Sequence, residues 1–133
     1  MYIIAGHATL VDDVIYESPV NTLVETVSCT NEKFFFIRHF MNGERNSVAF
    51  LFNGTKIIST EEFPTISSIA FVRYFKEILY TLKFLKKWRY QDSICFIGAD
   101  PLNGLCGLIA KYSRLVKKNV FYSVDYSESR FTN

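Results

Sequence analysis

Four side chains that can bind or release a proton stand where apolar runs of the sequence end. They are His7, His39, Asp100 and Asp125. Histidine is suited to general-base catalysis near neutral pH, and a carboxylate can play the same part when its surroundings adjust its pKa. If the apolar runs are parallel strands, their carboxyl ends share one edge of a sheet, where open α/β folds bind ligands. The sequence therefore predicts a site at that edge, with His7, Asp100 and Asp125 as candidate catalytic residues.

Residues next to these groups are candidate substrate ligands. Gly98 allows close backbone approach, and the free N–H groups of a helix that starts after Asp100 favour an anion. Asn103 can reach a hydroxyl-rich ligand. A purely structural interpretation stays open for two acids: Asp100 before a proline is a typical helix cap, and Asp125 can pair with a nearby arginine. The candidate substrate-binding residues are Gly6, His39, Gly98, Asn103 and Arg130.

The sequence lacks the motifs that several kinds of chemistry require. His7 and His39 are 32 positions apart with no third ligand nearby, so a zinc site is not expected. The loop at 98–104 is neither a dinucleotide fingerprint nor a P-loop, and no nucleophile elbow is present. We expect no metal and no cofactor.

The elements that must position these residues alternate between strands and helices. Strands are predicted at 2–5, 33–40, 94–98 and 120–124, a hairpin at 48–59 around Asn53-Gly54, and helices at 19–29, 65–89 and 102–116. This order predicts one α/β domain over residues 1–133. We expect a mostly parallel sheet with helices on both faces and the hairpin at one edge.

The longest predicted helix, 65–89, carries an apolar stripe that we expect to face the core: Phe71, Phe75, Ile78, Leu79, Leu82 and Leu85. Six Lys or Arg residues lie between Arg73 and Arg89, against one Glu. They form either a solvated face or a peripheral contact with anionic lipid head groups. No nucleic-acid-binding motif accompanies this charge, so a nucleic-acid partner is not expected.

Composition indicates the cellular compartment in which the chain is expected. Hydrophobic residues make up 49% of the 133 residues, enough for a core without disulfide bonds. The three cysteines are isolated, which indicates buried thiols in a reducing compartment. No signal peptide pattern and no apolar run of spanning length is present. We therefore expect a cytoplasmic protein.

The last forty residues resemble the amino-terminal segment of a group of microbial glycosyltransferases of the two-Rossmann-domain (GT-B) type. The resemblance rests on the strand 94–98, the loop Ala99-Asp100-Pro101-Leu102-Asn103, the helix at 104–110 and the closing run 120–131. That run is similar to a family pattern of tyrosines, a hydrophobic residue and Asp, followed by Arg-Phe. Glu128 stands where the family commonly has proline. Gly6-His7 and the end of strand 33–40 resemble two further family elements.

The resemblance implies a Rossmann-like, acceptor-side domain of a two-domain enzyme. Such an enzyme transfers a glycosyl group from an activated donor to an acceptor hydroxyl, and a base on this domain, His7 first and then Asp100 or Asp125, would deprotonate that hydroxyl. The donor-binding domain is expected on a second chain or a further segment. Sugars or lipid-linked acceptors are the implied ligands. The alternative is a non-catalytic, homodimeric interaction module, in which a second copy covers an exposed apolar surface.

Overall fold

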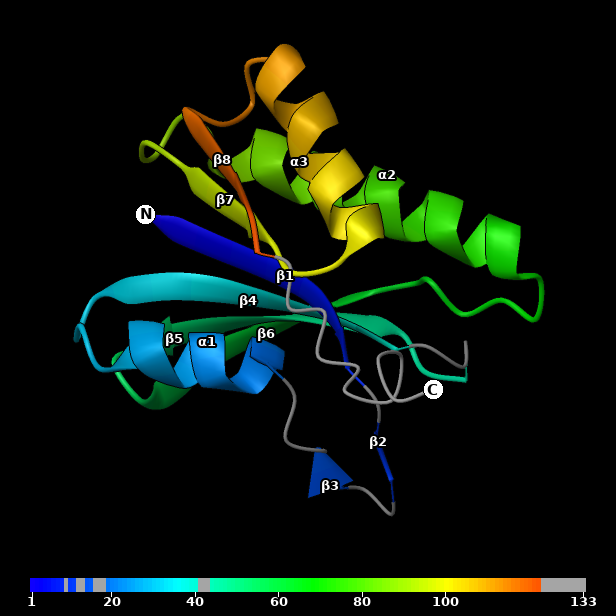
Figure 1. Ribbon diagram of the computed structural model, residues 1–133, viewed down its shortest axis with the longest axis horizontal. Coiled ribbons are helices and arrows are strands. Elements are labelled where there is room, and N and C mark those ends of the chain that lie inside the picture. The colour runs from blue at the N-terminus through cyan, green and yellow to red at the C-terminus, as the bar shows by residue number, and fades with distance from the viewer. Residues whose placement is uncertain (9, 12–13, 16–18, 41–43, 123–133) are drawn as a thin grey trace, which may run out of the picture.

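The computed structural model describes residues 1–8, 10–11, 14–15, 19–40 and 44–122 (Figure 1). They form a six-stranded mixed sheet with the strand order β6-β5-β4-β1-β7-β8. The strands of this sheet are β1 (Tyr2–Ala8), β4 (Lys33–Phe40), β5 (Ser47–Asn53), β6 (Lys56–Phe63), β7 (Cys95–Gly98) and β8 (Lys118–Phe121). A separate small hairpin joins β2 (Leu10–Val11) to β3 (Val14–Ile15).

Three helices cover the sheet from both sides, as predicted. Helix α1 (Pro19–Ser28) lies on one face, and α2 (Ala70–Trp88) and α3 (Pro101–Tyr112) lie together on the other (Figure 1). Helix α1 matches its predicted range to within one residue, whereas α2 begins five residues later than predicted and α3 ends four residues earlier. The fold class is therefore α/β with three layers.

The expectation of a mostly parallel sheet is too strong. The pairs β1–β4, β1–β7 and β7–β8 are parallel, whereas β4–β5 and β5–β6 are antiparallel. The antiparallel pairs arise because β4, β5 and β6 follow one another through short connections that leave no room for a crossover helix. The sheet is accordingly mixed, and β6 is one of its two edge strands, as predicted for the hairpin.

The turn between β5 and β6 is the Asn53-Gly54 turn that the sequence predicts. Gly54 adopts a φ of +60°, a left-handed conformation that glycine tolerates without strain. The pair β2–β3 was not predicted, because residues 6–17 were expected to form a loop. Strand β8 begins at Lys118, two residues before its predicted start.

The core has two parts, one on each face of the sheet. Phe34 and Phe36 of β4 pack toward α1, while Phe35 and Ile37 pack toward α2 and α3. Strand β4 is thus apolar on both faces because both faces are covered, which confirms the interpretation of its continuous apolar run. Phe35 makes an edge-to-face contact with Phe84 of α2 at 4.9 Å between ring centroids.

The predicted core stripe of α2 is confirmed at its carboxyl end, where Leu85 is buried, but not at its amino end. Phe71 and Phe75 of the predicted core stripe are 79% and 60% exposed. The buried residues are Arg73, Glu77, Thr81, Phe84 and Leu85. The amino-terminal half of α2 therefore turns a polar face toward the sheet, because it covers the polar carboxyl ends of β1 and β4 rather than their apolar middle.

The cysteines only partly follow the expectation of buried thiols. Cys106 is buried in α3, where burial raises the pKa of its thiol to about 12. Cys95 is half-buried and Cys29 is exposed, so the prediction is wrong for Cys29. Among the described residues, no helix has both the length and the apolar character needed to cross a bilayer.

Candidate functional site

His7 lies between two carboxylates at the carboxyl edge of the sheet. Its Nδ1 is 2.9 Å from Oδ2 of Asp100, and its Nε2 is 2.8 Å from Oε2 of Glu77. The backbone N–H of His7 also donates to the same oxygen of Asp100 at 2.9 Å. The ring is thereby fixed at both ends by residues that are 93 and 70 positions away in the sequence.

Asp100 is held in place by the start of α3. It is the helix N-cap and accepts from the backbone N–H of Asn103 at 2.9 Å, and Pro101 is the first helical residue. The side-chain amide of Asn103 donates to Asp100 Oδ2 at 2.8 Å. The predicted cap is confirmed, and it leaves Oδ2 of Asp100 free to bond with His7. One carboxylate therefore serves both as the helix cap and as the partner of the histidine.

Local packing explains why position 98 is a glycine. A Cβ at this position would lie 2.6 Å from the backbone carbonyl of Asn103, so the first turn of α3 can approach β7 only over a glycine. The close approach predicted for Gly98 thus exists, and its partner is this chain's own backbone. Gly6 lies opposite, where a Cβ would meet side chains of Ala99 and Val20 at 3.2 Å.

Glu77 brings the second carboxylate from the buried face of α2. It is 1% exposed, and its other oxygen, Oε1, has no hydrogen-bond partner. Arg73, one helical turn earlier, places its Nε 4.0 Å from that oxygen. An ionised carboxylate is costly to bury, so the bond to His7 is the contact that makes this position tolerable.

His39 lies behind His7, with their ring centroids 5.3 Å apart. It is fully buried, and its Nδ1 is 2.7 Å from the hydroxyl of Ser47, which bonds in turn to Thr65 at 2.8 Å. The Thr81 hydroxyl of α2 lies 3.5 Å from its other nitrogen. His39 is therefore enclosed by hydroxyl groups and the side-chain amide of Asn103 rather than by carboxylates.

The two histidines consequently differ in charge. Burial opposes a charged His7, but hydrogen bonds to Asp100 and Glu77 and the charges of both acids outweigh it and raise its pKa from 6.5 to about 9. Burial, together with the positive charge of His7, lowers the pKa of His39 to about 3. At neutral pH His7 is an imidazolium ion and His39 is neutral.

Asp100 is correspondingly a stable anion. Its partial burial opposes ionisation, yet the bonds from His7 and Asn103 hold the pKa of its carboxyl well below the usual range. Its side chain is 20% exposed, against 11% for His7. Asp100 is thus the most accessible member of the cluster and presents a fixed negative charge at the sheet edge. Such a carboxylate can accept hydrogen bonds from ligand hydroxyls.

The structure brings together most of the residues that the sequence singled out. His7, His39, Asp100 and Asn103 meet in one cluster, and Gly98 packs against the backbone of Asn103. Gly6 faces Val20 of α1 on the other face of the sheet. Asn103 is only 2% exposed and bonds to Asp100, so it supports the cluster from inside. The candidates Asp125 and Arg130 lie outside the described residues.

Glu77 is the member that the sequence analysis missed. It was counted only as the single acid within a basic helix. The available signal was its isolation: no other Asp or Glu occurs between 63 and 91. A lone acid on an otherwise basic, apolar helix marks a position where a negative charge has a specific partner.

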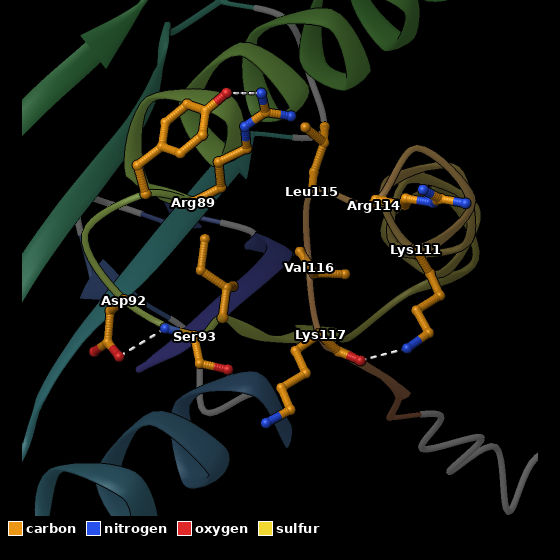
Figure 2. Close-up of a pocket in the computed structure, with 10 residues that line it drawn as sticks. Arg89, Asp92, Ser93, Lys111, Arg114, Leu115, Val116 and Lys117 are labelled. Atoms are coloured by element: carbon orange, nitrogen blue, oxygen red, sulfur yellow. Dashed lines mark hydrogen bonds between the residues drawn. The ribbon is translucent and has the colours of Figure 1, made fainter.

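A depression of about 550 Å³ opens at the opposite edge of the sheet, where β7 and β8 begin (Figure 2). Four cations line it: Arg89, Lys111, Arg114 and Lys117. Lys111 donates to the backbone carbonyl of Lys117, and the side chains of Arg114 and Lys117 point in different directions (Figure 2). These cations lie near the carboxyl ends of α2 and α3, where the helix dipole favours positive charge. They do not converge on one point.

Comparison with protein-family models, with curated proteins and with solved structures gives no match to this chain. The function of this chain is therefore inferred from the chemistry of the His7 cluster and its place in the fold.

Proposed function

We propose that this chain is the Rossmann-like, acceptor-side domain of a glycosyl-transfer system, completed by a donor-binding domain. The observation that carries the proposal is the bond between His7 and Asp100 across the carboxyl ends of the adjacent parallel strands β1 and β7. Open α/β sheets bind ligands at this edge. The residues at the edge also lie within the segments that resemble glycosyltransferases.

Each member of the cluster has a role in this proposal. Asp100, as a permanent anion, accepts a hydrogen bond from the acceptor and orients its hydroxyl group. Both ring nitrogens of His7 contact carboxylates in this structure, so the ring must turn Nε2 away from Glu77 before it can act as a base. Neutral His7 then takes the hydroxyl proton as the acceptor oxygen bonds to the anomeric carbon and the bond from that carbon to the leaving phosphate breaks. Glu77 sets the position of the ring and the pKa of His7.

The raised pKa gives this mechanism a distinctive pH dependence. With a pKa of about 9 for His7, only about 1% of the sites hold a neutral ring at pH 7. A reaction that uses neutral His7 as its base accelerates as the pH rises toward 9. A reaction in which His7 acts only as a fixed cation slows over the same interval.

Binding of an acceptor by the chain tests the proposal directly. A glycan array is probed with the wild type and with Asp100→Asn, which keeps a good helix cap but removes the charge. We expect a subset of saccharides to bind the wild type and to be lost in the variant. Calorimetry with UDP- and GDP-sugars should detect no binding, since the donor site is assigned elsewhere. Equal saccharide binding by both proteins, or tight binding of a nucleotide sugar, would overturn the assignment.

The outer surface of α2 and α3 favours a second element of function, peripheral attachment to an anionic membrane. The exposed apolar residues of this outer helix face are Phe71, Phe75, Leu105, Leu108 and Tyr112. Lysines accompany them, and the only acid in either helix, Glu77, is buried. Aromatic and basic residues without exposed acids match the chemistry of an anionic lipid surface.

The same face is less suited to the alternative of a homodimeric module. Two identical basic surfaces brought together by a two-fold axis would repel each other. Arg73, which marked the start of the predicted lipid contact, is turned inward toward Glu77 and does not contribute. The proposed membrane contact therefore uses the lysines and the exposed rings.

A further inference from the structure

The face of the sheet opposite the His7 cluster contains a cleft that neither the proposed reaction nor the proposed membrane contact uses. It has a volume of about 450 Å³, within the range of small-molecule sites. It lies between α1 and the β5–β6 hairpin, where α1 leaves the hairpin side of the sheet uncovered. The lining residues are Asn21, Val24, Glu25, Phe36, Arg38, Phe50, Phe52 and Ile57.

The floor of this Arg38 cleft is aromatic. Phe36 and Phe50 are stacked with 6.4 Å between ring centroids, and Phe52 lies 6.5 Å from Phe50. Phe52 stacks in turn on the buried Phe34 at 4.8 Å, which fixes its ring from below. A row of held rings with an open side is a surface on which a flat ligand ring can stack.

Arg38 adds a positive charge for which the described residues provide no counter-ion. Its guanidinium lies 4.7 Å from the centroid of Phe50 and 5.0 Å from that of Phe40. Its Nε is buried and makes no hydrogen bond, and within the described part of the chain no carboxylate pairs with it. Glu25 lines the same cleft but forms no ion pair with it.

The surroundings of Arg38 further disfavour its positive charge. Burial and the nearby positive charge of Arg45 both lower the pKa of Arg38. A stacked cation beside another cation, with a buried N–H left unbonded, is stabilised by an anion that approaches the guanidinium. The ring contacts explain how Arg38 packs, but they do not satisfy that N–H.

We propose that the Arg38 cleft binds a small anionic molecule that contains a flat ring, with the ring on Phe36, Phe50 and Phe52 and the anionic group on Arg38. A guanidinium pairs with carboxylate or phosphate through parallel hydrogen bonds, so either group fits. This site is on the other face of the sheet from His7 and does not depend on glycosyl transfer.

Three naphthalene probes test the proposal: naphthoate, naphthyl phosphate and the neutral naphthamide. Proton–nitrogen correlation spectra of the full chain follow the Nε–H signal of Arg38 and the backbone amides around the cleft. We expect both anions to shift these signals and to bind more tightly than the amide. The tighter of the two anions identifies the preferred anionic group.

Variants locate the binding. Arg38→Met should weaken both anions by about tenfold or more and leave the amide unchanged. Lys56→Met removes one positive charge from the same hairpin outside the cleft and should have no such effect. Ile57→Ala, at an exposed lining position, should weaken all three probes. Equal affinity for the amide and the anions, unchanged binding by Arg38→Met, or shifts confined to α2 and α3 would each overturn the proposal.

Discussion

Nε2 of His7 lies 2.8 Å from Oε2 of Glu77, the only acidic residue of α2. This bond joins the end of β1 to a helix that begins more than sixty residues later. It also explains why the helix buries a polar side chain where an apolar one is expected. Glu77 needs a cation, and the ring of His7, already bonded to Asp100, supplies it.

Replacement of Glu77 by Gln should lower the pKa of His7. The amide can still accept a hydrogen bond from Nε2, but it no longer contributes the negative charge that helps to raise the pKa to about 9. We expect the pKa to move toward 6.5 and the free energy of unfolding to fall by about 1–3 kcal/mol. Nitrogen NMR of the imidazole ring across a pH titration measures the first effect. An unchanged pKa of His7 would show that Asp100 alone sets it.

The stability of the fold should fall between pH 6.5 and pH 9. His7 binds its proton more tightly in the folded state, with a pKa of about 9, than in the unfolded chain, where it is about 6.5. Its contribution is complete below pH 6.5 and is lost as the pH rises through 9, by about 2–3 kcal/mol. Denaturant unfolding at several pH values measures this loss. In His7→Asn the free energy of unfolding should stay constant between pH 6.5 and pH 9. A parallel decline in both proteins would assign the loss of stability to another group.

His39 should act in the opposite direction. Its pKa in the folded state is about 3, below the ordinary value of 6.5, so the folded protein holds it neutral. Its contribution is complete above pH 6.5 and is lost as the pH falls toward 3. Together the two histidines place the maximum of stability near pH 6.5. In a His39→Gln variant the decline between pH 6.5 and about pH 4 should flatten. Phe71→Ala, at an exposed position away from the cluster, is the control that leaves this decline intact.

Local sequence signals were sufficient for most of the elements. The double-sided apolar run of β4, the Asn53-Gly54 turn and the Asp100-Pro101 helix start each depend on neighbouring residues, and each is confirmed. The common edge of His7, His39 and Asp100 followed from their positions at strand ends. These features were predictable because the physical cause lies within a few residues of the effect.

The orientation of α2 was not predictable in the same way. Its apolar periodicity indicated that Phe71 and Phe75 face the core, yet both are exposed. What decides the orientation is a contact with His7, distant in sequence, which has no signature in the periodicity of the helix itself. The role of Glu77 was missed for this reason. The proportion of antiparallel pairs depends on which strands are neighbours in the sheet. Local sequence patterns do not determine which strands become neighbours.

Alanine substitutions on opposite sides of α2 test the observed orientation. Phe84 is buried among the rings of Phe35, Phe63 and Trp88, so Phe84→Ala should destabilise the protein by about 3–5 kcal/mol. Phe71→Ala should change stability by no more than about 0.5 kcal/mol, because its ring is largely in water. Thermal and denaturant unfolding provide the measurement. Comparable losses in both variants would contradict the orientation.

The outer helix face should bind anionic vesicles through Phe71 and Phe75. We expect the wild type to co-sediment with vesicles of phosphatidylglycerol and phosphatidylcholine, and not with pure phosphatidylcholine. Phe71→Ser with Phe75→Ser should reduce binding, since two exposed rings no longer enter the interface. Added salt should also reduce binding, because the lysines act through screened charges. Binding to neutral vesicles alone, or a concentration-dependent dimer lost in the double variant, would favour another partner.

A methyl group at Gly98 should disturb the His7 site from beneath. The added Cβ would lie 2.6 Å from backbone atoms of Asn103, which cannot move without displacing the first turn of α3. We expect Gly98→Ala to cost at least about 2 kcal/mol and to lower the pKa of His7, because Asp100 moves with that turn. Gly6→Ala is the matched control: its Cβ meets only side-chain atoms at 3.2 Å, so the loss should be smaller. Unfolding measurements and the ring titration of His7 separate the two variants, and equal effects would mean that the approach of α3 to β7 does not position Asp100.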